Sequence, residues 1–234
     1  MDSKLSHVRE KLKIYNQEHL LSFYDELSEE QRARLLVQLE DIDFEKITKL
    51  YSDLKTISIP TDEIIEPLDY FVKSEIPIKE RRCLETQGSE LLKLGNYAVV
   101  TMAGGQGTRL GHKGPKGTFE LNLSPKKESL FEILADKLKK ANKRYNIEIP
   151  WYIMTSENNN DDTIRFFESK NYFDYNRDKV QFFIQNKLPL VSSENGKILL
   201  IEPYRVHEAS NGNGNLFESL ASNRHHQEDE KWWN

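Results

Sequence analysis

The sequence contains one cysteine, Cys83, and lacks long apolar runs. A single cysteine excludes a disulfide within the chain, and beside Arg81 and Arg82 an inert thiol is a simpler interpretation than a nucleophile. No stretch approaches the roughly 18 apolar residues that a membrane span requires. The first ten residues, MDSKLSHVRE, have no signal-peptide core. These absences predict a cytoplasmic protein without a membrane partner.

A basic excess is also lacking. The chain carries 33 Lys and Arg against 38 Asp and Glu, which makes its formal net charge −5. A nucleic-acid-binding surface is expected to be basic, so the charge argues against a nucleic-acid partner. With 234 residues the chain can bury a sizeable core and form one or two domains.

Residues 1–95 are expected to form a helical N-terminal arm. Ser28 followed by Gln31 predicts a capping box that opens a helix running to about Leu39. His7 and His19 lie among helical positions without acidic or cysteine partners, which argues against a metal site there. Apolar residues recur at helical spacing until prolines 60, 67 and 77 interrupt the pattern: Leu5, Val8, Leu12, Tyr15, Leu35, Leu39, Ile47, Leu50 and Leu54.

Residues 96–222 alternate between strand and helix patterns. Short apolar runs predict strands at residues 97–102, 150–155 and 180–184. Ser129 is expected to cap a helix, and a second helix is expected at residues 161–169. This order predicts an α/β domain with a largely parallel sheet that binds ligands at the carboxyl ends of its strands.

The end of this region carries different signals. Asn195-Gly196 predicts a hairpin turn that joins residues 188–192 to residues 197–201. Residues 223–234 read NRHHQEDEKWWN and are expected to form a polar, disordered tail. His225 and His226 lie near Glu228 and Asp229, but a chance metal site is a weaker interpretation of that tail than disorder or a shifted reading frame.

A glycine-rich segment at residues 101–117, TMAGGQGTRLGHKGPKG, follows the first expected strand. Glycines have no Cβ to hold a ligand away, so backbone N–H groups can gather around a polyanion. Arg109 and Lys116 add fixed positive charge. The segment therefore predicts a phosphate-binding site.

Three alternatives bear on this loop. A Walker A loop fails, because no Ser or Thr directly follows Lys116. A dinucleotide-binding fingerprint is weak, because Gly105, Gly107 and Gly111 are spaced one residue too long and Pro115 would break the helix that should follow. A purely structural glycine turn remains open, but it leaves Arg109 and Lys116 unexplained.

The segment from Met102 to Lys116 resembles the signature loop of the UDP-sugar pyrophosphorylases, particularly the UDP-N-acetylglucosamine type. Three further segments resemble motifs of that family in the same order: PWYIMTSE at residues 150–157, QNKLP at 185–189 and NGNGNLF at 211–217. The resemblance implies a Rossmann-like nucleotidyltransferase fold of the glycosyltransferase-A kind, with a mixed sheet that is incomplete in this chain. Residues 96–222 would be its nucleotide-binding half.

The resemblance also implies uridylyl transfer from UTP to a sugar-1-phosphate, with Mg²⁺ as cofactor. Arg109 and Lys116 would be catalytic, Arg109 holding the leaving pyrophosphate and Lys116 the α-phosphate. Asn213 would contact the sugar. The residues implied to bind UTP are Met102, Ala103, Gly104, Gly105, Lys116, Gln185 and Gly212. Taken alone, Gln185 would be read as an ordinary surface glutamine and the NGNGN segment as a flexible loop.

The sequence departs from the family in two respects. Asn211 and Asn215 replace the usual aspartate and second glycine of the sugar-facing motif. The family's next strand, which ends near a metal-binding aspartate, would lie beyond Asn234, so no metal ligand is identifiable. We expect a C-terminally truncated transferase of doubtful activity alone, and the alternative is a noncatalytic UTP-binding or interaction module. N-acetylglucosamine-1-phosphate and glucose-1-phosphate remain equally open, and so does the oligomeric state.

Overall fold

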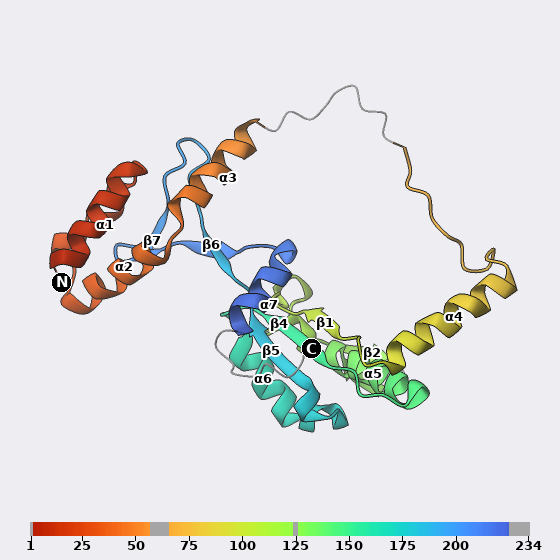
Figure 1. Cartoon of the computed structure of the whole chain (residues 1–234). Coiled ribbons are helices and arrows are strands. Elements are labelled where there is room, and N and C mark those ends of the chain that lie inside the picture. The colour runs from red at the N-terminus through yellow and green to blue at the C-terminus, as the bar shows by residue number, and fades with distance from the viewer. Residues whose placement is uncertain (1, 57–65, 124–125, 225–234) are drawn as a thin grey trace. The chain divides into compact units, whose positions relative to one another are not determined.

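The computed structural model describes residues 2–56, 66–123 and 126–224 (Figure 1). Contacts divide the chain into two compact units. The first comprises Met1–Glu66 and Lys187–Ser210, and the second comprises Pro67–Asn186 and Asn211–Asn234. These units differ from the expected division at residue 95: residues 67–95 group with the second unit, and residues 187–210 group with the N-terminal helices.

The first unit combines helices with two short antiparallel ladders. Its elements are α1 (Asp2–Ile14), α2 (Glu29–Asp41), α3 (Phe44–Thr56), β6 (Lys187–Pro189), β7 (Leu200–Glu202), β8 (Arg205–Val206), β9 (Glu208–Ser210) and the 3-10 turns Glu18–Leu21 and Tyr24–Glu26. β6 pairs with β9, and β7 pairs with β8. The predicted capping box of Ser28 and Gln31 is confirmed at the start of α2.

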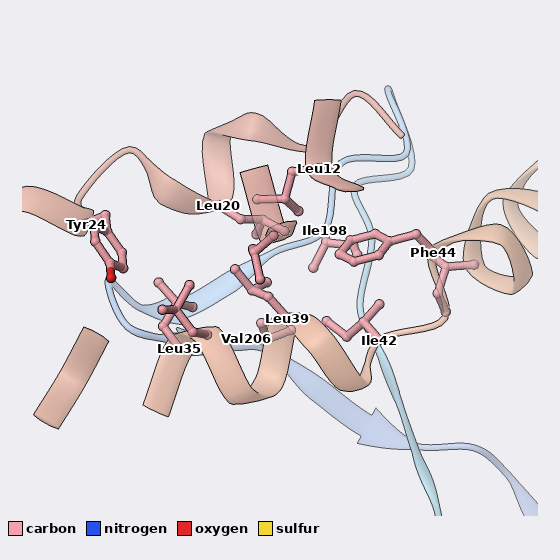
Figure 2. Packing of buried hydrophobic residues seen from close by; sticks show 12 residues of the cluster. Leu12, Leu20, Tyr24, Leu35, Leu39, Ile42, Phe44, Ile198 and Val206 are labelled. Atoms are coloured by element: carbon pink, nitrogen blue, oxygen red, sulfur yellow. The ribbon is translucent and has the colours of Figure 1, made fainter. Parts of the chain in front are cut away.

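The core of the first unit joins segments far apart in sequence (Figure 2). Ile198 and Val206 pack among buried residues of the helical region, which include Leu12, Leu20, Leu35, Leu39 and Phe44. The side chain of Gln17 donates to the carbonyl of Gly196 at 3.1 Å and accepts from the N–H of Ile198 at 2.9 Å. These bonds explain why residues 187–210 belong to this unit.

The hairpin turn predicted at Asn195-Gly196 is confirmed, although its ladder is shorter than expected. Val191 pairs with Ile198 as an isolated bridge, and the N–H of Ser192 donates to the carbonyl of Lys197 at 2.8 Å. The residues expected at the start of the first hairpin strand pair elsewhere: β6 pairs with β9. The turn motif specifies the reversal of the chain, but the longer-range partner of β6 depends on the fold.

The second unit contains a parallel sheet of β1 (Val99–Met102), β4 (Trp151–Thr155) and β5 (Val180–Ile184), in the order β1-β4-β5. All three predicted strands are confirmed, and so is the parallel pairing. The predicted helices are present as α5 (Leu130–Tyr145), which begins with a capping box of Ser129 and Glu132, and α6 (Asn160–Ser169).

Helices cover the two faces of this sheet. Because successive side chains of a strand point to opposite faces, Trp151 and Ile153 face one cluster while Tyr152 and Met154 face another. The first cluster includes Phe131 of α5 and Phe167 of α6. The second includes Leu216 and Leu220 of α7 (Leu216–Arg224). Buried apolar area on both faces is the main stabilising contribution to such a sheet.

Within the region expected to be helical, α4 (Ile78–Lys93) begins directly after Pro77, where the apolar pattern had been interrupted. An antiparallel pair of β2 (Glu120–Leu123) and β3 (Lys126–Ser129) was not expected. The short 3-10 turns of the second unit are Thr108–Leu110, Lys116–Thr118, Asn171–Asp174, Arg177–Lys179 and Asn213–Asn215.

Two expectations concern parts of the chain that the structure does not describe fully. Asn223 and Arg224 belong to α7, while the rest of the predicted tail, with His225, His226, Glu228 and Asp229, lies outside the described residues. Within the described ranges, no helix is long and apolar enough to cross a membrane.

Candidate nucleotide-binding site

The glycine-rich loop continues from the carboxyl end of β1 and then folds back on itself. The N–H of Ala103 donates to the carbonyl of Met154 at 2.7 Å, which continues the β1–β4 ladder by one bond. The N–H of Lys116 donates to the carbonyl of Gly105 at 3.0 Å, and that of Gly107 donates to Gly114 at 2.9 Å. The loop is therefore a closed, hydrogen-bonded structure and not an open coil.

Several glycines of the loop are required by the fold itself. A Cβ on Gly107 would lie 2.8 Å from His112, and one on Gly117 would lie 2.1 Å from the ring of Phe131. Gly111 and Gly114 have φ values of 68° and 135°, which side chains disfavour. At these four positions glycine is therefore required by the fold, as the alternative of a purely structural glycine turn predicts.

Gly104 and Gly105 have a different environment. A Cβ on Gly105 would meet no described atom within 4 Å, and one on Gly104 would lie 3.3 Å from Oε1 of Gln185. Neither residue has a positive φ. Gly105 therefore has no structural requirement for glycine among the described residues, and its exposed backbone is accessible to a ligand.

His112 holds the loop together from inside. Its Nε2 lies 2.7 Å from Oγ1 of Thr118, and the same hydroxyl lies 2.8 Å from the carbonyl of Pro115. Because the hydroxyl donates its one hydrogen to Pro115, it must accept from Nε2 of His112. His112 also packs edge-on against Phe119. Sequence reasoning missed this role, since one histidine between glycines carries no recognisable pattern.

Arg109 and Lys116 are exposed on this loop, together with Lys113. Within the part of the chain that the structure describes, no side-chain hydrogen bond or ion pair engages Arg109 or Lys116. Residues 103–118 contain no Asp or Glu. The loop therefore presents uncompensated positive charge, which favours a polyanionic ligand.

A buried asparagine joins this loop to the segment that follows β4. Asn159 is 1% exposed, and its Nδ2 donates to the carbonyls of Ala103 at 2.9 Å and Gly105 at 3.4 Å. Its Oδ1 accepts from the N–H of Ser156 at 2.8 Å. Sequence reasoning missed Asn159, because a run of asparagines is typical of an exposed loop.

Gln185 lies at the carboxyl end of β5 and is 6% exposed. Its N–H donates to the carbonyl of Thr155 at 2.9 Å, and its Nε2 donates to the carbonyl of Gly212 at 2.6 Å. Its Oε1 faces Gly104. The structure thus brings together three of the predicted positions, Gln185, Gly104 and Gly212, which are far apart in the sequence.

Gly212 directly precedes the 3-10 turn Asn213–Asn215. Its φ is 73°, and the turn leads into α7. Asn213 is exposed, whereas Asn215 is buried, accepts from Oγ of Ser219 at 2.7 Å and donates to Glu218. Asn215, the departure from the family's glycine, therefore has a structural role at the start of α7.

The remaining predicted residues lie at the same end of the sheet. Met102 is the last residue of β1 and is 53% exposed, and Ala103 follows it in the ladder. No hydrogen bond or ring contact given by the described residues joins Arg109 or Lys116 to Gln185. Arg109 and Lys116 belong to the same loop as Gly104, which Oε1 of Gln185 faces.

The described residues neither support nor contradict the expected magnesium ion. They contain no group of three or more His, Cys, Asp or Glu side chains that could hold a metal. The loop that would contact phosphates also supplies no carboxylate, although Mg²⁺ is normally bound through one or two carboxylates in addition to phosphate oxygens.

A separate cavity of about 810 Å³ lies away from this site. Its lining includes Glu148, which precedes β4, and Arg177, which precedes β5. It therefore borders the amino ends of the strands, whereas the glycine loop and Gln185 lie at their carboxyl ends. Ligands of open α/β sheets bind at the carboxyl ends, so we place the candidate site at the loop.

The fold and site together define a class: an α/β protein whose parallel sheet carries a cationic, glycine-rich loop after its first strand. The family described as UTP--glucose-1-phosphate uridylyltransferase matches residues 42–228. The chain belongs to this family, and the recognition of a UDP-sugar pyrophosphorylase relative from the sequence is confirmed.

Individual relatives agree with this assignment. The chain is 34% identical to UDP-N-acetylglucosamine diphosphorylase 2 of Arabidopsis thaliana over 230 residues, covering 92% of this chain and 45% of that protein. It is 34% identical to UDP-N-acetylglucosamine pyrophosphorylase of Saccharomyces cerevisiae over 225 residues, covering 95% and 46%. The chain thus spans about half the length of the curated relatives it matches.

Solved structures are similar in fold. The crystal structure of the uridine diphosphate N-acetylglucosamine pyrophosphorylase from Trypanosoma brucei, in complex with an inhibitor, matches with a TM-score of 0.67 and 26% identity, covering 94% of this chain and 45% of that one. A putative UDP-N-acetylglucosamine pyrophosphorylase from Entamoeba histolytica matches with a TM-score of 0.56 and 33% identity, covering 68% and 40%. The predicted fold class is confirmed.

Proposed function

We propose that this chain carries the nucleotide-binding half of a uridylyltransferase that forms a UDP-sugar and pyrophosphate from UTP and a sugar-1-phosphate. The observation that carries the proposal is the meeting of Gln185, Gly104 and Gly212 beside the cationic loop. This arrangement offers an amide for a base and backbone with charge for phosphates, within one site.

In the proposed reaction, an oxygen of the sugar-1-phosphate attacks the α-phosphorus of UTP. The bond from this phosphorus to the oxygen that bridges to the β-phosphate breaks, and pyrophosphate leaves with the electron pair of that bond. No covalent protein intermediate is required, so the residues contribute by aligning two polyanions and neutralising charge. Arg109 would contact the leaving pyrophosphate, and Lys116 would contact the α-phosphate. Asn213, exposed at the start of the turn before α7, is proposed to contact the sugar.

Gln185 is proposed to read uracil. Its carboxamide can donate and accept hydrogen bonds at once, as the edge of uracil requires. Its Nε2 has one hydrogen engaged by Gly212, and its Oε1 accepts no hydrogen bond from a described residue. The second amide hydrogen and Oε1 therefore remain for hydrogen bonds to a base.

We propose that Mg²⁺ binds together with UTP as its counterion. Among the described residues, no cluster of carboxylates is present to hold a separate metal ion.

Isothermal titration calorimetry with UTP and CTP, each with magnesium, tests the nucleotide site. We expect UTP to bind the wild-type chain more tightly than CTP, and Gln185→Ala to remove this preference, because an alanine cannot distinguish the two bases. Equal affinities of the wild type for the two nucleotides would contradict the role of Gln185. The absence of any heat with UTP would contradict the site as a whole.

A second measurement separates the enzyme from the binding module. Pyrophosphate release from UTP is followed with N-acetylglucosamine-1-phosphate and with glucose-1-phosphate as acceptors. Turnover with either acceptor supports the transferase and identifies the sugar. UTP binding without turnover favours the alternative, a noncatalytic UTP-binding module.

A further inference from the structure

The chain contains three pairs in which glycine follows asparagine: Asn195-Gly196, Asn211-Gly212 and Asn213-Gly214. Such pairs are chemically reactive, because the backbone nitrogen of the second residue can attack the side-chain carbonyl carbon of the asparagine and close a five-membered imide. Glycine offers no Cβ to hinder this approach. The fold decides which pair reacts, since the nitrogen must not be engaged in a hydrogen bond and the backbone must be able to rotate.

The pair Asn195-Gly196 is held by two hydrogen bonds of its turn. The N–H of Gly196 donates to the carbonyl of Ser192 at 2.9 Å. The Oδ1 atom of Asn195 accepts from the N–H of Lys197 at 3.0 Å. Both reacting groups are therefore engaged, and attack requires local opening of the turn.

The pair Asn213-Gly214 lies inside a helical turn. Both residues belong to the 3-10 turn Asn213–Asn215, and the carbonyl of Asn213 accepts from the N–H of Leu216. A helical ψ holds the nitrogen of Gly214 out of the plane in which the imide ring closes. Ring closure at Asn213 therefore requires that the turn unwinds.

The pair Asn211-Gly212 lacks both restraints. The N–H of Asn211 donates to the carbonyl of Asn186 at 3.0 Å, which fixes the chain before the Cα of Asn211 but not after it. In the described parts of the chain, no hydrogen bond engages the side chain of Asn211 or the N–H of Gly212. Gly212 is exposed, and a Cβ built on it would meet no described atom within 4 Å, so water has access.

We propose that Asn211 is a modification site, which deamidates spontaneously to aspartate and isoaspartate and so places a negative charge beside the candidate nucleotide site. The backbone nitrogen of Gly212 loses its proton to solvent and bonds to Cγ of Asn211. The Cγ–Nδ2 bond breaks, and Nδ2 leaves as ammonia after taking up a proton from water.

Water then opens the imide. Breaking the bond from the Gly212 nitrogen to Cγ gives aspartate, and breaking its bond to the backbone carbonyl carbon of residue 211 gives isoaspartate. The nitrogen of Gly212 regains its proton in either case. The whole conversion consumes one water and releases one ammonia, and it needs no enzyme, oxidant or cofactor.

The modification bears on the site because of its neighbours. The carbonyl of Gly212 accepts from Nε2 of Gln185 at 2.6 Å, so the new carboxylate lies one residue away from a group that Gln185 holds. Isoaspartate also adds one carbon to the main chain just before Gly212. A carboxylate repels phosphates, so UTP affinity should fall as the protein ages. This consequence rests on the proposed function, whereas the deamidation does not.

Mass spectrometry of the folded full chain, incubated at neutral pH in water labelled with heavy oxygen, tests the modification. Fragmentation of the peptides locates each product and separates aspartate from isoaspartate. We expect Asn211 to convert ~10-fold or more faster than Asn195 and Asn213, which react only after their turns open. Each converted residue should carry the oxygen label, and isoaspartate should be present. Faster conversion at Asn195 or Asn213, no conversion at Asn211, or aspartate without isoaspartate would overturn the proposal.

The same chain unfolded in guanidinium is the control for the fold. Asn195 and Asn211 are each followed by glycine, so their rates should become similar once the hydrogen bonds of the turn are lost. A preference for Asn211 that persists unchanged in the unfolded chain would overturn the structural explanation.

Calorimetry with UTP and magnesium measures the consequence for the site. We expect affinity to fall by ~5-fold in Asn211→Asp and in the converted fraction of aged wild type. Asn211→Gln, whose longer side chain would have to close a six-membered ring, should keep the affinity of its own fresh sample on ageing. Equal affinities of fresh wild type and Asn211→Asp would overturn the effect on the site. If fresh wild type does not bind UTP, the proposed function fails, while mass spectrometry still decides the deamidation.

Discussion

The side-chain amide of Asn159 donates a hydrogen bond of 2.9 Å to the carbonyl of Ala103, which joins the segment after β4 to the first residue after β1. The same amide reaches the carbonyl of Gly105 at 3.4 Å, while its oxygen accepts from Ser156. One buried side chain thus holds three backbone groups around the start of the glycine loop. These three hydrogen bonds require a side chain that carries a donor and an acceptor on one planar group, as an amide does.

Asn159→Asp is expected to destabilise the protein and to weaken UTP binding. A carboxylate cannot donate to the carbonyls of Ala103 and Gly105, and it places a buried negative charge beside them. The loss of a buried hydrogen bond with an unsatisfied partner costs about 1–3 kcal/mol. Thermal unfolding and calorimetry measure the two effects. The matched control is Asn158→Asp, which makes the same change at an exposed neighbour. Equal behaviour of the two variants would contradict the role of Asn159.

Two glycines of the loop should separate stability from binding. Gly117→Ala would place a Cβ 2.1 Å from Phe131, so we expect a loss of stability of about 1–3 kcal/mol or more. Gly105→Ala meets no described atom within 4 Å, so the melting temperature should be nearly unchanged while UTP binding weakens. If Gly105→Ala binds UTP with the affinity of the wild type, the proposal that the nucleotide approaches this residue closely is wrong.

Arg109→Ala and Lys116→Ala should act on binding and not on folding. Both side chains are exposed and have no partner among the described residues, so stability should change by less than about 0.5 kcal/mol. A charge-assisted contact contributes about 1.5–3 kcal/mol, so each variant should weaken UTP binding by ~10-fold or more. Lys143→Ala, an exposed lysine on α5, controls for net charge. Unchanged affinity for UTP in both loop variants would contradict the proposed phosphate-binding site.

Acid should weaken the start of α5 through Glu132. Burial opposes ionisation of this carboxyl, but hydrogen bonds from Ser129 and the nearby charge of Lys170 outweigh it, and its pKa is lowered from 4.5. A depressed pKa contributes stability above the unfolded value, and this contribution is lost as the pH falls through the folded value. We therefore expect the wild type to be more stable than Glu132→Gln at neutral pH.

The difference between wild type and Glu132→Gln should shrink as the pH falls below about 4.5, because the protonated carboxyl then resembles the amide. Chemical denaturation across this pH range measures the difference in free energy of unfolding. Glu168→Gln, on an exposed part of α6, serves as control. A difference that is independent of pH would contradict the assignment to ionisation of Glu132.

The site was predicted from the sequence in part. The loop with Arg109 and Lys116, and the positions of Gln185 and Gly212, were identified from motifs, and the structure places Gln185 and Gly212 together. His112 and Asn159 were missed. Each acts through partners that are close only after folding, so neither leaves a pattern along the chain. Their assigned functions, like those of the predicted residues, remain predictions until the experiments above are done.

Local features of this protein were determined by the sequence alone: the capping box at Ser28, the helix cap at Ser129, the turn at Asn195-Gly196 and the positions of the three strands. Each depends on residues within a few positions of one another, where side-chain chemistry and hydrophobic periodicity act directly on the backbone. Tertiary structure alone decided that residues 187–210 pack with the N-terminal helices, and that Gln185, Gly104 and Gly212 lie together. These outcomes depend on contacts between residues far apart in the chain, and such contacts form only where the folded backbone brings complementary surfaces together.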